Sequence, residues 1–487
     1  MRRLLGRWCA LLCVLALCFA PASAWAEFSP LLTSLTQGKG IHADVSGSLD
    51  ALDPLTAQSL TAVNSWLSRL RVSLDVGNGG DSAALSMDGD PLFSVRIDRT
   101  QAGTLTAFSP SGGAYWTDAD GKDALRLLSG GEDWLIPSPT LLPAFYLNLA
   151  QQLYPLLAEA VTPRTVQDST SVKNALSSQS YVNYVFKDGE LNEIWPQVLE
   201  ILLPLLRETL TDQPAWYAAA ERYLTTATFS GECRFKRLLD KSGGDMGLQF
   251  TGQMEAEGLD KRKITLFGGF TPDRGGYVSL SLPAVKGKNT LKITFGAKLT
   301  VNGSVNTLTF DGSFTRTLNG ASVSAEMEGS LKNTVKNGGE QWSGKVTATI
   351  QDSGGKTVWT ISPALTGAND TLSGTVTVQK KVGSAVKLKG TVRLSLSPTA
   401  EPPALSAENA ANLRGLDEAA ARAQVLQEMT PLSRVFLRLM AALPDDERIL
   451  LTHDLRTDAW MNGPSAPAAD PEPDEEPWDT WIVVEEE

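Results

Sequence analysis

The stretch Thr226–Pro398 alternates apolar and polar side chains, and glycine-rich turns interrupt it after about every dozen residues. A period of two with one apolar face is typical of a half-buried β-strand. We therefore predict a long antiparallel β-meander of about eleven strands. The clearest of these strands places six apolar residues on one face: Leu291, Ile293, Phe295, Ala297, Leu299 and Val301.

The turns between these predicted strands contain the residues that hairpins require. Asn302-Gly303, Asn319-Gly320 and Asn337-Gly338-Gly339 are examples. Glycine and asparagine adopt the positive φ angles of tight turns more readily than other residues do. Successive strands are therefore expected to pair with each other in chain order.

A glycine lies near the middle of nearly every predicted strand, and by parity all but Gly296 fall on the apolar face. Glycine weakens a strand, so its recurrence indicates a sharp bend or the close approach of another element. The alternative is that the pattern only reflects a chain rich in Gly, Ser and Thr. Eleven strands spaced at about 4.8 Å form a wide sheet, and wide twisted sheets tend to curl. We predict a strongly curved, half-barrel-like sheet with its apolar side inward. The glycines are Gly231, Gly252, Gly296, Gly312, Gly329, Gly344, Gly374 and Gly390.

Residues 27–225 mix helical and strand patterns, which makes the predicted fold class α+β. Asp53-Pro54 is expected to open a helix. Two later stretches, Pro139–Val161 and Glu190–Leu210, are leucine-rich and have helical spacing. The second is apolar over more than half of its circumference. Such a helix is buried in a core, which is the commoner case, or it faces a hydrophobic ligand or a membrane surface.

We predict that a hydrophobic ligand cavity lies between the curved sheet and the leucine-rich helices. The bulky candidates come from one side of the second helix, and two glycines of the meander would allow close approach. The cavity candidates are Trp195, Leu199, Leu202, Leu206, Gly344 and Gly374.

Residues 1–26 have the features of a bacterial secretory signal peptide. Three arginines form a basic start, Trp8–Ala20 is apolar, and Ala24-Trp25-Ala26 is the expected cleavage site. The two later cysteines of this leader each follow leucine, whereas a lipidated cysteine follows a small residue, so lipidation is not expected. The apolar run is too short for a good transmembrane helix. We predict a secreted or periplasmic chain with no transmembrane segment in its mature part.

The C-terminal part divides into a helical segment, residues 399–462, and an acidic tail, residues 463–487. The tail contains nine carboxylates and no Lys or Arg, a composition that predicts disorder. The meander, by contrast, contains more Lys and Arg than Asp and Glu. The tail is therefore either a solubilising extension or a segment that docks on a sheet edge or on a protein partner. The docking candidates are Trp478, Trp481, Ile482 and Val484.

Few residues in this chain could support catalysis. Only two histidines occur, His42 and His453, and the mature chain retains a single cysteine, Cys233. An internal disulfide is excluded, and a Cys/His zinc site or a Ser-His-Asp site is disfavoured. Gly80-Asp81-Ser82 resembles the start of a hydrolase signature but lacks the partner histidine motif. We predict no catalytic residues, metal or cofactor, and we expect that the chain is not an enzyme and binds no nucleic acid.

Two functional hypotheses follow from these patterns. The first is an exported cell-envelope binding or carrier protein for a lipid or another hydrophobic ligand. In outline the layout is similar to the half-barrel carriers that move lipoproteins and lipids across bacterial envelopes. The second is a structural or interaction scaffold of the envelope whose core is simply full. A hydrolase that uses paired carboxylates is a distant third, because sequence alone does not show which Asp and Glu residues converge.

Overall fold

The structure is a computed structural model of the chain, whose described residues exclude both termini and several internal segments. The predicted signal peptide and acidic tail, with Trp478, Trp481, Ile482 and Val484, lie outside the described residues. Of the helical segment 399–462, only part is described. The described residues are 40–53, 55–76, 80–100, 103–109, 113–117, 141–167, 171–172, 176–178, 180–209, 214–257, 259–271, 275–284, 289–318, 321–368, 371–399, 410–428, 435 and 439–441.

Strands dominate the fold, and helices form a small part of it. The strands outside the predicted meander are β1 (Gly40–Leu52), β2 (Leu70–Val76), β3 (Gly80–Met87), β4 (Asp90–Thr100), β5 (Gly103–Ser109), β6 (Ala114–Thr117), β7 (Arg164–Val166), β8 (Ser171–Val172), β9 (Leu176–Ser177), β10 (Ser180–Phe186) and β22 (Ala411–Asn412). The helices are α4 (Ala57–Arg69), α6 (Leu141–Ala160), α7 (Glu190–Thr209), α8 (Pro214–Thr225) and α9 (Glu418–Glu428).

The predicted meander is confirmed, with eleven described strands between Thr228 and Thr399 that pair in chain order. These strands are β11 (Thr228–Leu239), β12 (Asp245–Ala256), β13 (Leu259–Thr271), β14 (Gly275–Pro283), β15 (Thr290–Asn302), β16 (Val305–Leu318), β17 (Ala321–Lys336), β18 (Gly339–Asp352), β19 (Gly355–Ala368), β20 (Thr371–Val382) and β21 (Ala385–Thr399). In the turn between β17 and β18, Asn337 and Gly338 have φ angles of 53° and 75°. This is the left-handed pair that a tight hairpin requires.

The meander continues into the N-terminal strands to form one 20-stranded sheet. Strand β1 pairs antiparallel with β21 over most of its length, so that Gly47 lies opposite Val392 and Leu49 opposite Gly390. From β1 the sheet continues through β2 to β6 in chain order. Strand β22 pairs with β6 in parallel, and all other pairs within this sheet are antiparallel. The division of the chain into domains at residues 225 and 226 stays a prediction.

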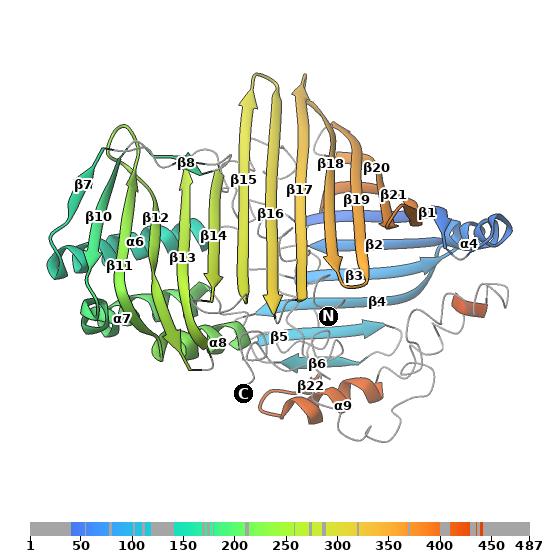
Figure 1. The fold of residues 1–487 in the computed structure, drawn as a ribbon. Helices are drawn as coiled ribbons and strands as arrows, with labels where there is room; N and C mark the ends of the chain where they lie inside the picture. The colour runs from blue at the N-terminus through green and yellow to red at the C-terminus, as the bar shows by residue number, and fades with distance from the viewer. Residues whose placement is uncertain are drawn as a thin grey trace.

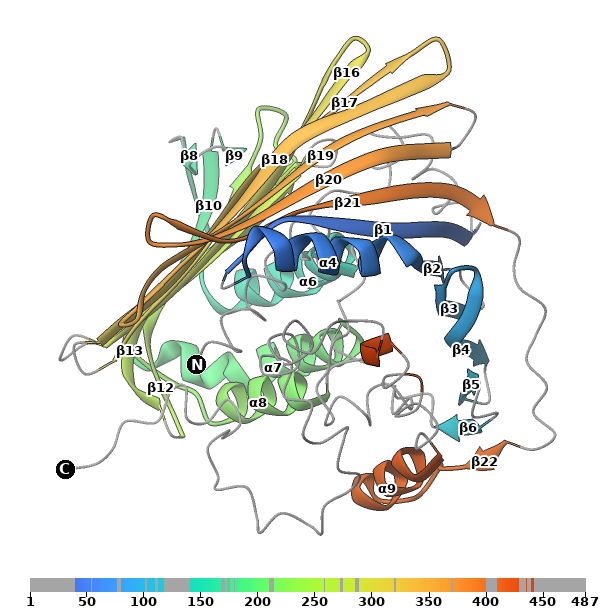
Figure 2. The same ribbon diagram turned by 90° about the vertical axis from the view of Figure 1, so that its right-hand side faces the viewer.

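The sheet is open and changes direction along its length. Its end strands are β7, which pairs with β10, and β22, and these two are not paired with each other in the described part of the chain. In Figure 1, strands β15 to β17 run almost vertically, whereas β1 to β6 run almost horizontally. The view in Figure 2 shows the same sheet as a twisted, bent layer with α6, α7 and α8 on one side of it.

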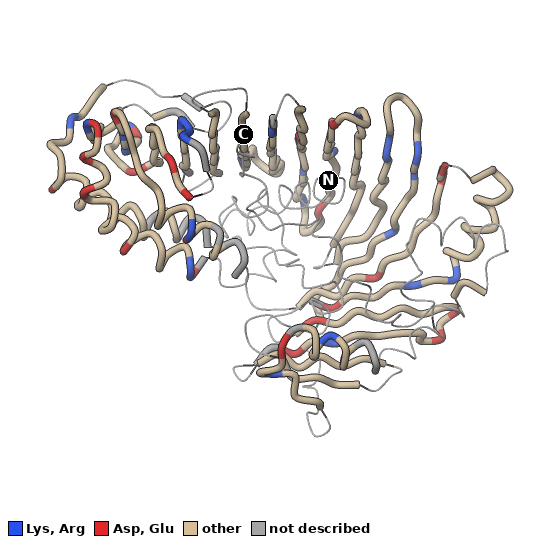
Figure 3. Tube along the Cα trace, turned by 60° about the horizontal axis from the view of Figure 1, so that its bottom comes forward, with Lys and Arg blue, Asp and Glu red and all other residues tan. Residues whose placement is uncertain are grey.

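One face of the sheet is mainly apolar, and we call it the inner face. The register connects Phe250 in β12 with Leu266 in β13, Leu280 in β14 and Ile293 in β15, and the alternation continues along the remaining strands. Phe295, on the same face, is fully buried. The opposite, outer face is mainly polar, because the residues that alternate with the inner ones include Lys292, Thr294 and Lys298 in β15. Figure 3 marks the positions of Lys and Arg along the chain.

Helices cover the inner face near the two ends of the sheet. Helices α6 and α7 pack on β10 to β13, where Leu157, Val198 and Phe235 belong to one buried cluster. At the other end, α9 packs through Ala421 and Val425 on the cluster formed by β4, β5 and β6. Helix α4 lies beside β1, and its Trp66 Nε1 donates to the carbonyl oxygen of Leu439 at 2.8 Å. The ends of the sheet therefore have cores built from both strands and helices.

Candidate binding surfaces of the sheet

The predicted cavity residues on α7 lie near the core of the helix-covered end. The Trp195 ring contacts Phe229 edge-on at a centroid distance of 4.6 Å, and its Nε1 donates to the carbonyl oxygen of Leu224 at 2.9 Å. These contacts make Trp195 a packing residue. Three further α7 residues are half-buried: Leu199, Leu202 and Leu206.

Gly344 and Gly374 lie on the inner face, as predicted, where the backbone of a neighbouring strand approaches them closely. A Cβ atom at Gly344 would lie 2.2 Å from the carbonyl oxygen of Ser330. At Gly374 it would lie 2.2 Å from the carbonyl oxygen of Ala364. Both distances are far below normal contact, so these positions require glycine. The approaching element is the adjacent strand, not a helix.

A half-exposed apolar surface occupies the inner face of β18 to β21. Val346, Ile361 and Val378 lie opposite one another in the register of β18, β19 and β20. Ile361 is 38% exposed, whereas Phe295 on the same face in β15 is fully buried. Lys380 Nζ lies 5.3 Å from the ring centroid of Trp359 at one side of this surface. We call the following residues the inner apolar patch: Val346, Trp359, Ile361, Val376 and Val378.

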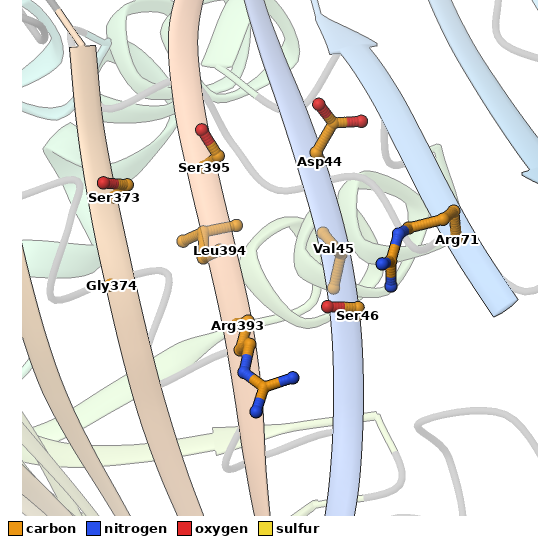
Figure 4. Close-up of a pocket in the computed structure, with 9 residues that line it drawn as sticks. All are labelled: Asp44, Val45, Ser46, Arg71, Ser373, Gly374, Arg393, Leu394 and Ser395. Carbon is orange, nitrogen blue, oxygen red and sulfur yellow. The ribbon is translucent and has the colours of Figure 1, made fainter. Parts of the chain in front are cut away.

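A pocket of about 450 Å³ lies on the outer face, at the junction between β20, β21, β1 and β2 (Figure 4). Strand alternation places polar side chains there, because residues two apart share a face. The pocket includes Gly374 but none of the other predicted cavity residues. Its lining consists of Asp44, Val45, Ser46, Arg71, Ser373, Gly374, Arg393, Leu394 and Ser395.

Two arginines flank the centre of this pocket. Ser46 pairs with Arg393 of β21, and Arg71 precedes Val72, which pairs with Val45 on the other side of β1. Neither guanidinium forms an ion pair with a carboxylate among the residues that the structure describes. Figure 4 shows the Arg71 guanidinium beside Ser46 and the Arg393 guanidinium on the opposite side of β1.

A second polar group continues from the pocket across β1, β2 and β3. His42 Nδ1 and Asp75 Oδ1 are hydrogen-bonded at 2.7 Å, and the Ser82 hydroxyl donates to Asp75 Oδ2 at 2.7 Å. His42 Nε2 lies 3.3 Å from Asp44 Oδ2. The hydrogen bond to Asp75 is the main cause that raises the pKa of His42 above its usual value, although partial burial opposes it.

Ser82 and His42 are 40 residues apart in the sequence, and strand register brings them into one row with Asp75. The register pairs His42 with Asp75 and Asp75 with Ser82. The carboxylate lies between the two other groups, so the Ser82 hydroxyl bonds to Asp75 and not to His42. A Ser-His-Asp nucleophile requires the serine to bond to the imidazole. In this row Asp75 accepts hydrogen bonds from both neighbours on the outer face of the sheet, and the arrangement is not a catalytic triad.

No metal site is evident in the described ranges, which contain no group of three His, Cys, Asp or Glu residues placed to hold an ion. Within those ranges, too, no helix is both long enough and apolar enough to cross a membrane.

Comparison with known proteins gives little further information. No protein-family model matches the sequence, and no curated protein sequence matches it. The solved structure described as "Outer-membrane expressed OmpT of Vibrio cholerae" aligns with 74% of this chain and 98% of that chain. The identity is 8% and the TM-score is 0.20. That score is too low for the similarity to support a fold assignment or a function.

Proposed function

We propose that this chain is an exported binding or carrier protein of the bacterial cell envelope that holds a hydrophobic ligand against the inner face of its sheet. The observation that carries the proposal is the inner apolar patch. Its side chains are only half-buried, although they share a face with the fully buried core of β15 to β17. Burial of apolar surface is favourable by about 0.8 kcal/mol for each CH₂ group removed from water.

The proposed ligand site is the concave side of a strongly curved, half-barrel-like sheet. Helices α6 and α7 cover another part of the same face, over β10 to β13, and strands β14 to β17 separate that part from the patch. The secretory leader predicted for residues 1–26 supports an envelope or secreted location. A lipid or a similar apolar molecule fits a surface made of Val, Ile and Trp with Lys380 at its margin.

The proposal is tested by binding of N-phenyl-1-naphthylamine, an uncharged apolar dye whose fluorescence rises in apolar surroundings. We expect the mature protein to bind the dye, and Ile361→Glu to weaken binding at least about tenfold, equivalent to about 1.4 kcal/mol. A carboxylate placed within an apolar contact loses hydration, and it also removes the apolar surface of Ile361 that the dye would cover.

Val358→Glu is the matched control because Val358 lies on the same strand but on the outer face, opposite Thr349. It should leave dye binding unchanged. Native mass spectrometry of the protein purified without detergent provides a second test, because a co-purified lipid would add a defined mass. Absence of dye binding together with the mass of the bare chain would favour a scaffold whose core is full.

A further inference from the structure

We infer that the pocket on the outer face is a binding site for a phosphate group, held between the guanidinium groups of Arg71 and Arg393 above Ser46. This site lies on the opposite side of the sheet from the inner apolar patch. The inference therefore goes beyond the proposed function and does not depend on it.

The two arginines are placed so that both can reach one anion. They occupy the two strands that neighbour β1, and adjacent strands are about 4.8 Å apart, so their Cα atoms are separated by about 10 Å. An extended arginine side chain spans most of that distance, so two such chains can converge above the strand between them. In Figure 4 the Ser46 hydroxyl lies between the two guanidinium groups.

Neither arginine has its charge neutralised by the protein in the described ranges. Other arginines are paired: Arg69, at the end of α4, has its Nη2 2.7 Å from Asp88 Oδ2, and Arg237 on β11 forms a fork-like pair with Asp245. Arg71 makes only a long hydrogen bond, 3.4 Å from its Nη1 to the carbonyl oxygen of Leu70. Two unneutralised guanidinium groups at one pocket favour an anionic occupant.

The one acidic residue in the lining, Asp44, does not occupy the cationic end. Its carboxylate lies 3.3 Å from His42 Nε2, and its side chain is 58% exposed. Figure 4 places Asp44 toward the opposite end of the pocket from Arg393. The pocket therefore has a cationic end, defined by Arg71, Ser46 and Arg393, which lies apart from its acidic end.

The donor set fits a phosphate group better than a carboxylate. One guanidinium can satisfy both oxygens of a carboxylate through a bidentate contact. Two guanidinium groups and a hydroxyl offer more donors than a carboxylate can use, whereas a tetrahedral phosphate presents three or four oxygens in different directions. Ser373 and Ser395 add two more hydroxyl groups to the lining. The phosphate could belong to a dissolved molecule or to a lipid headgroup.

The test is isothermal titration calorimetry of the mature protein with inorganic phosphate at low ionic strength, because exposed charges are screened by salt. We expect Arg71→Ala and Arg393→Ala each to weaken binding at least about tenfold, and the double variant to show none. Arg393→Lys should recover only part of the affinity, since lysine keeps the charge but lacks the planar fork. Circular dichroism of each variant verifies the fold.

Lys389→Ala is the matched control. Lys389 lies on the same strand and the same face as Arg393, and it is paired with Asp50 at 3.3 Å. Its removal should leave phosphate binding unchanged. An equal loss in the Lys389 variant, or unchanged binding in the double arginine variant, would overturn the inference, because binding would then be diffuse attraction to a basic surface.

The source of the phosphate is tested by co-sedimentation with phosphatidylcholine vesicles, with and without phosphatidic acid. Binding that requires phosphatidic acid and is lost in the double arginine variant assigns the site to a lipid headgroup. Calorimetric binding of inorganic phosphate without vesicle binding assigns it to a dissolved phosphate. Failure of both ligands to bind would reject the site altogether.

Discussion

Strands β10 to β13 and strands β18 to β21 belong to the same sheet and have the same alternation, but their inner faces differ in burial. In the first group, Phe235 and Phe250 are each 5% exposed and contact each other in a tilted arrangement at a centroid distance of 4.5 Å beneath α6 and α7. In the second group, Ile361 is 38% exposed. Alternation therefore determines which side chains share a face, whereas burial depends on what packs against that face.

This comparison separates buried from partly exposed apolar residues that have the same spacing, and the partly exposed group is the proposed ligand site. The helix-covered residues form a closed cluster that includes aromatic contacts between Phe229, Phe235 and Phe250. The inner apolar patch has strand neighbours on both sides, but its outermost side chains stay in partial contact with solvent. Substitutions in the first group should reduce folding stability strongly, and substitutions in the second should affect ligand binding more than stability.

The largest expected effect is the loss of stability in Phe250→Ala. Removal of a buried phenyl ring from a packed cluster costs about 3–5 kcal/mol. Ile361→Ala should cost only about 1 kcal/mol, because part of that side chain is already exposed. Urea denaturation followed by tryptophan fluorescence measures both. Equal losses would show that β18 to β21 are packed as tightly as β10 to β13, and would remove the basis for the ligand proposal.

The next effect concerns the inner-face glycines of β18 to β21. Gly344→Ala is expected to destabilise by about 1–3 kcal/mol. Its φ angle of +157° disfavours other residues, and the new Cβ would lie 2.2 Å from the carbonyl oxygen of Ser330. Thermal melting measures the change. The direction agrees with the sequence-based expectation of close approach at this glycine.

Gly47→Ala provides the control for that experiment. Gly47 is also on the inner face, but its Cβ would make only an ordinary contact, 3.7 Å from the carbonyl oxygen of Thr391. Alanine there should be neutral or should stabilise by about 0.4–1 kcal/mol, because it restricts the unfolded chain. If Gly344→Ala melted at or above the wild-type temperature, strand approach would not explain the glycine at that position.

Features set by neighbouring residues were predictable from the sequence. The strand around Phe295, the number of meander strands and the turn at Asn337-Gly338 all depend on local alternation and turn chemistry, and all are confirmed. The start of helix α4 is an exception. It was expected at Asp53-Pro54, but the helix begins at Ala57, where the Thr56 side chain accepts from the backbone N–H of Ser59.

Features that depend on distant pairing were not predictable. The contact of β1 with β21 joins Ser46 to Arg393, and nothing in either segment specifies the other. The outer-face pocket exists only because β1 pairs with β21 on one side, which brings Arg393, and with β2 on the other, which brings Arg71. For the same reason, the sequence could not show that His42, Asp75 and Ser82 form one row.

The smallest expected effect tests whether β1 and β2 keep their register in solution. A fixed register keeps Asp75 hydrogen-bonded to His42, which raises the histidine pKa above its usual value. The protonated form of His42 therefore stabilises the fold. That contribution is fully present below the unfolded-state pKa of about 6.5, and it is lost as pH rises through the higher folded-state value. Because the side chain is 33% exposed, solvent screening keeps the energy small.

Asp75→Asn should lower the pKa of His42, and NMR titration of the imidazole carbon-bound protons measures the change. Only two histidines occur in the chain, so His453→Gln assigns the remaining signal to His42. Asp50→Asn is the charge-matched control. Asp50 lies on β1, the strand of His42, but it is paired with Lys389, so its substitution should leave the titration unchanged. The stability difference between wild type and Asp75→Asn should be larger in mildly acidic than in alkaline solution. A wild-type His42 that titrates at the usual value for an exposed histidine would mean that β1 and β2 do not hold this register in solution.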